Sequence, residues 1–184
     1  MKAIAIEWKK IPTWAKNTLI IIGSSILLGL FAHVAIPLSP VPIATQPTLV
    51  LLLAVLLGSK RAPAAVAGFL AQGALGFPVF ANGLAGMGIL IGPRGGYLFG
   101  YLVAAYVVGK IVEAFPHRKL LTAFLAMAIG NVILYIMGAS WLSTFIGVEK
   151  ALLLGVVPFL GFDLLKILGC IQILRWVQRD LYRS

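Results

Sequence analysis

Two charges of opposite sign stand three residues apart inside an apolar segment near the end of the chain. The stretch PFLGFDLLKILGC, residues 158–170, contains Asp163 and Lys166, and all its other side chains are uncharged. A charge at the centre of a membrane helix costs about 2.5 to 3.5 kcal/mol. At positions i and i+3 the two side chains share a helix face and partly neutralise each other. Their retention favours a binding role, while an ion pair that only fixes helix register stays open as an alternative.

Further residue types suited to binding lie near this pair or in two other segments. Phe159 shares the helix face of Asp163, so a carboxylate, an ammonium group and an aromatic wall form a plausible receptor for a small polar ligand with an apolar body. Asn82, in a glycine-rich segment, is able to donate and accept hydrogen bonds. Arg94 precedes a helix whose amino-terminal amides are able to receive an anion. Gln46 is either another contact or a helix cap, and the glycine-rich segment fits a tight turn equally well.

The composition predicts that these residues lie in a membrane. Of 184 residues, 61% are hydrophobic and only 11% are charged, and the mean hydropathy is +1.04, which excludes a soluble domain of this size. We expect one all-α polytopic domain over residues 1–184, with an interfacial amino terminus (1–17), helices (18–177) and a tail (178–184). Six helices are predicted, at Thr18–Ile36, Gln46–Leu57, Ala62–Leu75, Gly95–Val112, Lys119–Gly138 and Ala151–Val177.

The basic residues predict an orientation. Twelve of the fifteen lysines and arginines fall at one side of these helices, and only Arg94 and Lys150 fall at the other. By the positive-inside rule, both termini are then cytoplasmic, in a plasma membrane of bacterial type. The net charge of +10 fits contact with anionic lipid headgroups and gives no reason to expect nucleic acid.

The two segments expected on the outer side are irregular but apolar. Residues 36–47 contain four prolines, and residues 76–96 are rich in glycine. Irregular backbone at membrane depth persists only where protein or a water-filled cavity satisfies its polar groups. We therefore predict a concave site beneath these two segments.

The sequence lacks the residues that nucleotide hydrolysis, aspartyl proteolysis and metal binding require. The sequence has no nucleotide-binding G-x-x-x-x-G-K-[ST] motif, only one intramembrane carboxylate, which excludes an aspartyl protease dyad, and no clustered ligands for a metal. Neither catalysis nor a cofactor is expected. Ser25, Gly29 and Ala32 form a groove of small residues that would let another helix approach closely, either within this chain or from a partner.

Three long motifs resemble one known family. The stretches PLSPVPIATQPTLVLLLAVLLG (37–58), GALGFPVFANGLAGMGILIGPRGGYLFGY (73–101) and DLLK (163–166) resemble the BioY family, the biotin-binding S components of energy-coupling factor (ECF) transporters. The resemblance extends from about residue 32 to residue 166. It implies a six-helix S-component fold that captures biotin from outside and associates with a transmembrane coupling subunit and two cytosolic ATPases.

The resemblance also implies site residues. The family's Asp-x-x-Lys falls on Asp163 and Lys166, and its loop over the ligand falls on residues 80–97, which include Gly83 and Tyr97. The family's first helix faces the coupling subunit with small residues, here Ser25 and Gly29 in place of the more usual alanines. Arg94 replaces an expected threonine.

Biotin fits the expected site in two orientations. In one, Asp163 accepts from a ureido N–H, Lys166 donates to an oxygen, and Asn82 completes that end. The valerate then points outward toward Gln46, Arg94 or the amide-rich start of the fourth predicted helix. In the other, Lys166 holds the valerate. A self-sufficient transporter in which Asp163 carries a proton is the main alternative function, and a structural subunit is a third.

Overall fold

The computed structural model describes residues 11–36, 40–115 and 119–181, so most of the predicted interfacial amino terminus and the end of the predicted tail lie outside the described residues. Within these ranges, five helical runs are long and apolar enough to cross a membrane. They are α2 (Thr13–Phe31), α3 (Gln46–Ala74), α5 (Gly95–Ala114), α6 (Lys119–Ile146), and the run that comprises α7 (Val148–Gly155) and α8 (Val157–Leu181).

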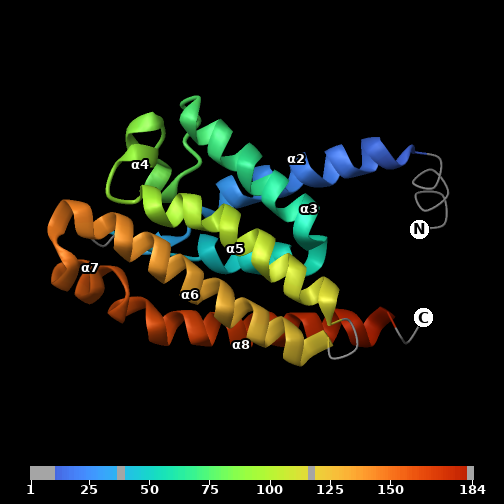
Figure 1. Cartoon of the computed structure of the whole chain (residues 1–184). Coiled ribbons are helices and arrows are strands. Elements are labelled where there is room, and N and C mark those ends of the chain that lie inside the picture. The colour runs from blue at the N-terminus through green and yellow to red at the C-terminus, as the bar shows by residue number, and fades with distance from the viewer. Residues whose placement is uncertain (1–10, 37–39, 116–118, 182–184) are drawn as a thin grey trace.

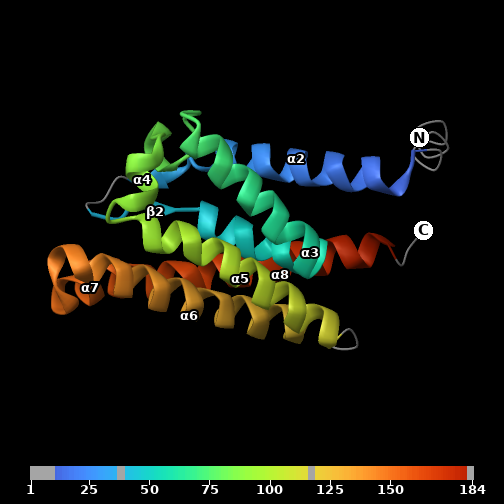
Figure 2. The same ribbon diagram turned by 45° about the horizontal axis from the view of Figure 1, so that its top comes forward.

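Helix α3 consists of two limbs that meet at Gly58. This residue has φ 78° and ψ −177°, a conformation that glycine adopts without a steric penalty. A Cβ there would also lie 2.5 Å from Oε1 of Glu113. The Glu113 carboxylate instead accepts hydrogen bonds from the backbone N–H and the hydroxyl of Ser59, both at 2.7 Å. The chain turns back at this point (Figures 1 and 2). Gly58 is the first residue of the predicted gap between Leu57 and Ala62, but residues 59–61 are helical, so the gap is shorter than predicted.

Two predicted helix ends were wrong, those of the first and the fifth predicted helix. Helix α2 ends at Phe31, and Ala35–Ile36 form strand β1, which pairs antiparallel with β2 (Ile43–Ala44). The prolines that follow β1 favour this extended backbone. Helix α6 continues past Gly138 to Ile146, because that glycine makes room for the ring of Tyr97 and does not end the helix.

The last predicted helix is broken. Helix α7 ends at Gly155, and α8 begins at Val157 with Pro158 as its second residue. Proline has no amide hydrogen and is tolerated only in the first turn of a helix, so the chain must start a new helix near this position.

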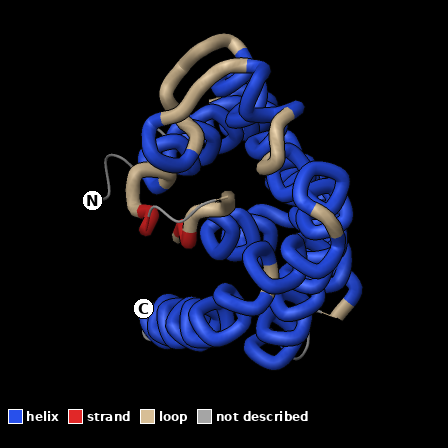
Figure 3. The backbone as a smooth tube through the Cα atoms, turned by 90° about the vertical axis from the view of Figure 1, so that its left-hand side faces the viewer, coloured by secondary structure: helices blue, strands red, loops and turns tan. Residues whose placement is uncertain are grey.

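The elements at the two ends of the bundle differ. The start of α2, the end of α8 and the turn inside α3 lie at one end (Figures 1 and 2). The strands, the short 3₁₀ helix η1 (Ala81–Gly83) and helix α4 (Met87–Ile91) lie at the other end (Figures 1 and 3). Between the ends, α5 packs between α3 and α6. This core places the proline-rich and glycine-rich segments together over the helix ends.

Candidate functional site

A cavity lies at the end of the bundle that carries these two segments. The proline-rich segment lines it with residues from Val41 to Pro47, and the glycine-rich segment lines it with Phe80, Ile89 and Arg94 among others. Helices α5, α6 and α8 supply the remaining walls. Its volume of about 60 Å³ is enough for several water molecules, at roughly 10 to 15 Å³ for each. The predicted concave site is therefore confirmed.

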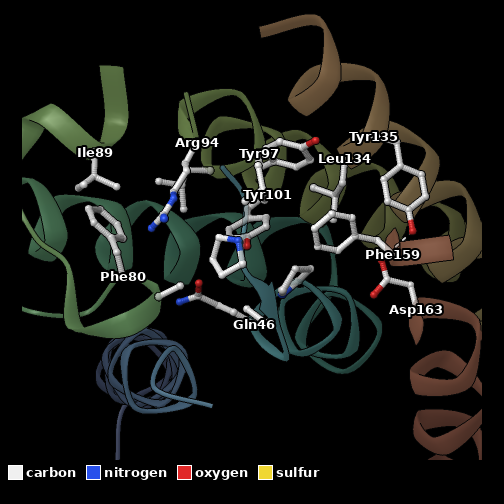
Figure 4. A pocket seen from close by; sticks show the side chains of 16 residues that line it. Gln46, Phe80, Ile89, Arg94, Tyr97, Tyr101, Leu134, Tyr135, Phe159 and Asp163 are labelled. Carbon is white, nitrogen blue, oxygen red and sulfur yellow. Dashed lines mark hydrogen bonds between the residues drawn. The ribbon is translucent and has the colours of Figure 1, made fainter. Parts of the chain in front are cut away.

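At one end of the cavity, charged and polar groups form hydrogen bonds with one another. Lys166 Nζ lies 3.0 Å from Asp163 Oδ1 and donates to it, and the Tyr135 hydroxyl donates to Oδ2 at 2.7 Å (Figure 4). Lys166 also donates to the carbonyl of Ala44 at 2.8 Å. The side chain of Asp163 is only 7% exposed and that of Lys166 is 20% exposed. The buried carboxylate and the partly buried ammonium are thus paired within the chain, and the hydrogen bond from Lys166 to Ala44 joins α8 to strand β2.

Arg94 marks the opposite end of the cavity (Figure 4). Its Nε donates to the carbonyl of Pro40 at 3.0 Å, which joins the two irregular segments. Its Nη1 is buried and has no hydrogen-bond partner among the described residues. Burial lowers the pKa of Arg94 from its ordinary value, yet a guanidinium remains charged at neutral pH. This end of the cavity is therefore lined by a positively charged residue.

Aromatic side chains separate the two charged ends. The hydroxyl of Tyr97 donates to the carbonyl of Gly155 at 2.6 Å, so its position is fixed while its ring lines the cavity. Phe80 packs edge-to-face on Phe69, with ring centroids 5.5 Å apart. Tyr101 and Phe159 are also buried and line the cavity. These walls suit an apolar ligand body with polar groups at both ends.

Gln46 connects three parts of the chain beside the cavity. It is 1% exposed, and its Nε2 donates to the carbonyls of Leu28 at 3.1 Å and of Val79 at 3.4 Å. These bonds hold the end of α2 and the glycine-rich segment against the start of α3. Since both N–H groups are used, the amide oxygen is the group that Gln46 can offer to a ligand.

The cavity brings together most of the binding residues expected from the sequence. Asp163, Phe159, Gln46, Arg94 and Tyr97 line it. Lys166 contacts Asp163 and is not among the lining residues. Asn82 and Gly83 lie in η1, in left-handed conformations with φ of 64° and 71°, and neither lines the cavity. A ligand contact from Asn82 would require this loop to move.

The three residues expected at a partner interface are covered by the chain itself. Ser25 accepts a hydrogen bond from Nε2 of Gln72 at 2.5 Å, and a Cβ on Gly29 would lie 2.9 Å from the side chain of Val79. Ala32 is completely buried. In this structure the groove of small residues therefore packs α2 against α3 and the glycine-rich segment.

The sequence reasoning missed Tyr135 and Tyr101, which both line the cavity. Tyr135 is the more consequential, because it donates to the one buried carboxylate. The sequence feature that could have identified Tyr135 is a phenol in the middle of the apolar run of α6, because a hydroxyl in such a run requires a hydrogen-bond partner.

Comparison with known proteins identifies relatives over most of the chain. A model of the BioY family matches residues 4–183. The biotin transporter BioY of Thermotoga maritima is 39% identical over 143 residues, which cover 77% of this chain and 83% of that protein. The biotin transporter BioY2 of Lactococcus lactis subsp. cremoris is 32% identical over 151 residues, covering 81% and 82%. The crystal structure of the S-component for biotin from an ECF-type ABC transporter is similar in fold, with a TM-score of 0.82, 23% sequence identity, and coverage of 92% of this chain and 95% of that one.

Proposed function

Because the chain belongs to the BioY family, we propose that it is the biotin-binding S component of an ATP-driven ECF-type vitamin uptake transporter, which captures biotin from the outer side. Relatives with 39% and 32% identity are named biotin transporters. The observation that carries the proposal is the cavity, which has the Asp163 network at one end and Arg94 at the other. On this proposal, the protein is a transport subunit and no enzyme, and biotin is its transported ligand.

The chemistry of biotin matches this arrangement of groups. Its ureido ring has two N–H donors and a strong carbonyl acceptor, so it complements the carboxylate of Asp163 together with the remaining N–H donor of Lys166. Its thioether ring is apolar and fits between Phe159 and Tyr101. The valerate then extends toward Gln46 and Arg94. In the reverse pose, the valerate carboxylate would have to displace Asp163 from the ammonium of Lys166, which already makes two hydrogen bonds.

We further propose the membrane topology that the sequence predicts. Counted as separate spans, the two limbs of α3 bring the number of membrane helices to six. Both termini lie in the cytoplasm, because the basic residues gather at that side. The chain then forms a single polytopic domain in the plasma membrane, with the cavity open to the outside.

The proposed partners are a transmembrane coupling subunit and two cytosolic ATPases, which supply the nucleotide hydrolysis for which this chain has no motif. Docking through Ser25, Gly29 and Ala32 would require α2 to separate from Gln72 and Val79. A cross-link that holds α2 against α3 should then leave biotin binding intact and abolish assembly with the coupling subunit.

Calorimetry with detergent-purified protein tests the ligand, and uptake assays test the mode of transport. We expect one biotin per chain, with no heat of binding for a vitamin that lacks the ureido ring, such as pyridoxine. Reconstituted vesicles should accumulate biotin only when the coupling subunit, both ATPases and ATP are present. Uptake by this chain alone, driven by a pH gradient, would instead establish the proton-coupled alternative. A folded, monodisperse protein that binds no biotin would refute the proposed ligand.

A further inference from the structure

A second, larger hollow is a groove between the end of α5 and the start of α6. These two helix ends lie at the end of the bundle away from the cavity (Figure 1). The volume of the groove is about 530 Å³, far more than the share of about 30 Å³ that one water molecule takes in the liquid. Thr122 lines it together with apolar residues, which are Ile111, Ala114, Phe115, Leu121, Leu125 and Ile129.

The groove presents an apolar surface that the described chain leaves uncovered. The hydroxyl of Thr122 donates to the carbonyl of Phe115 at 3.3 Å, so its polar group is already engaged. Phe115, Leu121 and Leu125 are exposed. In a protein that spans a membrane, such a surface meets lipid, and an acyl chain that lies in the groove gains contacts with both helices.

Lys110 supplies a positive charge beside this groove. It lies directly before Ile111 and one helical turn before Ala114, so it stands on the same side of α5 as the groove. Its side chain is exposed, and its Nζ lies 5.8 Å from the centroid of the ring of Tyr106, a cation–π contact at the surface of the helix. No carboxylate of the described residues lies within 4.0 Å of this ammonium. It is therefore available to an anion.

We propose that the groove binds an anionic phospholipid of the inner leaflet, with one acyl chain between α5 and α6 and the phosphate at Lys110. The inference rests on the proposed topology, which places this end of the bundle at the cytoplasmic side, and it does not require biotin as the ligand. Packing of the acyl chain does not distinguish one headgroup from another, because all lipid tails are apolar. A lysine near the membrane surface attracts an anionic headgroup, so Lys110 provides the preference.

Native mass spectrometry of the full chain in detergent tests this site. The protein is titrated with dioleoyl phosphatidylglycerol or with dioleoyl phosphatidylcholine, which have identical acyl chains and differ in net charge. The parent protein should bind the anionic lipid about fivefold more tightly, the effect of one lysine near an anionic surface. Lys110→Met should remove this preference and leave the affinity for phosphatidylcholine within about twofold. Glycerol 3-phosphate, which has no acyl chain, should not displace the bound lipid.

Two further variants test the groove and the position of the charge. Leu125→Trp fills the groove from an exposed position and should weaken the binding of both lipids, and Ile129→Trp does the same from the next turn of α6 where the first variant does not fold. Lys60→Met is the matched control, because Lys60 is an exposed lysine of α3 close to the turn at Gly58, at the same end of the bundle. It should change neither affinity.

Three results would overturn the inference. The first is equal binding of the two lipids by the parent protein. The second is an equal loss in Lys60→Met and Lys110→Met, since the preference would then reflect only the overall charge of this end. The third is unchanged lipid binding by the tryptophan variants, and a loss of assembly with the coupling subunit in those variants would then assign the groove to that partner. Calorimetry with biotin on the same preparations tests the proposed function separately, because none of these lipid results depends on biotin binding.

Discussion

The two charged ends of the cavity differ in how completely the chain satisfies them. At the Asp163 end, each carboxylate oxygen has a donor, and the ammonium of Lys166 has two acceptors. At the Arg94 end, only Nε is used, and Nη1 is buried without a partner in the described part of the chain. The polar groups of the first end are satisfied by one another, whereas the guanidinium at the second end has no carboxylate partner among the described residues.

This difference separates two reasons for burying a charge. A carboxylate and an ammonium on the same helix face neutralise each other, so the membrane tolerates them, and their remaining lone pairs and hydrogens stay available to a neutral ureido group. A single guanidinium has no such compensation and depends on the ligand. On the proposed function, the Asp163 end therefore orients the ligand and the Arg94 end contacts its negative charge.

Asp163→Asn should have the largest effect of any single change at the first end. The amide keeps the size of the side chain but cannot neutralise Lys166, which leaves a buried ammonium without its counter-ion. Loss of one partner of a buried hydrogen-bonded charge pair costs about 2 to 5 kcal/mol, so the affinity for biotin should fall about thirtyfold to several thousandfold in calorimetry. Glu149→Gln, at an exposed carboxylate of α7, should leave the affinity unchanged.

Lys166→Met should weaken biotin binding by about tenfold to a hundredfold. The substitution removes the counter-ion of Asp163 and the bond that ties α8 to the carbonyl of Ala44. A methionine fills similar volume, so the helix should still pack. Lys150→Met, at an exposed lysine of α7, is the matched control. If Lys166→Met folds and binds biotin like the parent protein, the pair serves helix packing alone and the comparison of the two ends fails.

Tyr135→Phe should have a smaller effect, because the ion pair remains intact. The phenylalanine retains the ring and deletes only the hydroxyl that donates to Asp163 Oδ2 at 2.7 Å. A hydrogen bond to a charged group is worth about 1.5 to 3 kcal/mol, and a ligand donor can replace part of it, so we expect a loss of about tenfold. Tyr106→Phe, at a tyrosine of α5 that is 50% exposed, should bind normally. A loss as large as that in Asp163→Asn would mean that Tyr135 itself contacts the ligand.

The sequence predicted the parts of this site that local patterns determine. Hydropathy located the membrane helices, prolines and glycines located the irregular segments over the cavity, and the spacing of Asp163 and Lys166 placed them on one helix face. The hydrogen bond from Tyr135 joins residues 28 positions apart on different helices, so it depends on how α6 packs against α8. No local pattern contains that information.

The groove of small residues on α2 illustrates the same limit. The spacing of Ser25 and Gly29 predicts close approach of another segment, and the structure places Gln72 and Val79 of this chain there. Small side chains define a surface without identifying what covers it. The end of α2 was misplaced for a related reason, since β1 is stabilised by pairing with β2 as well as by the proline that follows it.

The opposite end of the bundle provides the smallest expected change in binding and tests whether the effects above are specific to the cavity. Ser59→Ala removes the hydroxyl that donates to Oε2 of Glu113 at 2.7 Å and keeps the backbone bond to Oε1. Loss of one such bond at the start of a helical limb costs about 1 kcal/mol, so the melting temperature should fall by a few degrees. The affinity for biotin should stay within about twofold, because this turn lies at the end of the bundle away from the cavity (Figures 1 and 2). A large loss of affinity in this variant would mean that the two ends are coupled through α3 and α5, and the losses in the cavity variants could then no longer be read as lost contacts with the ligand.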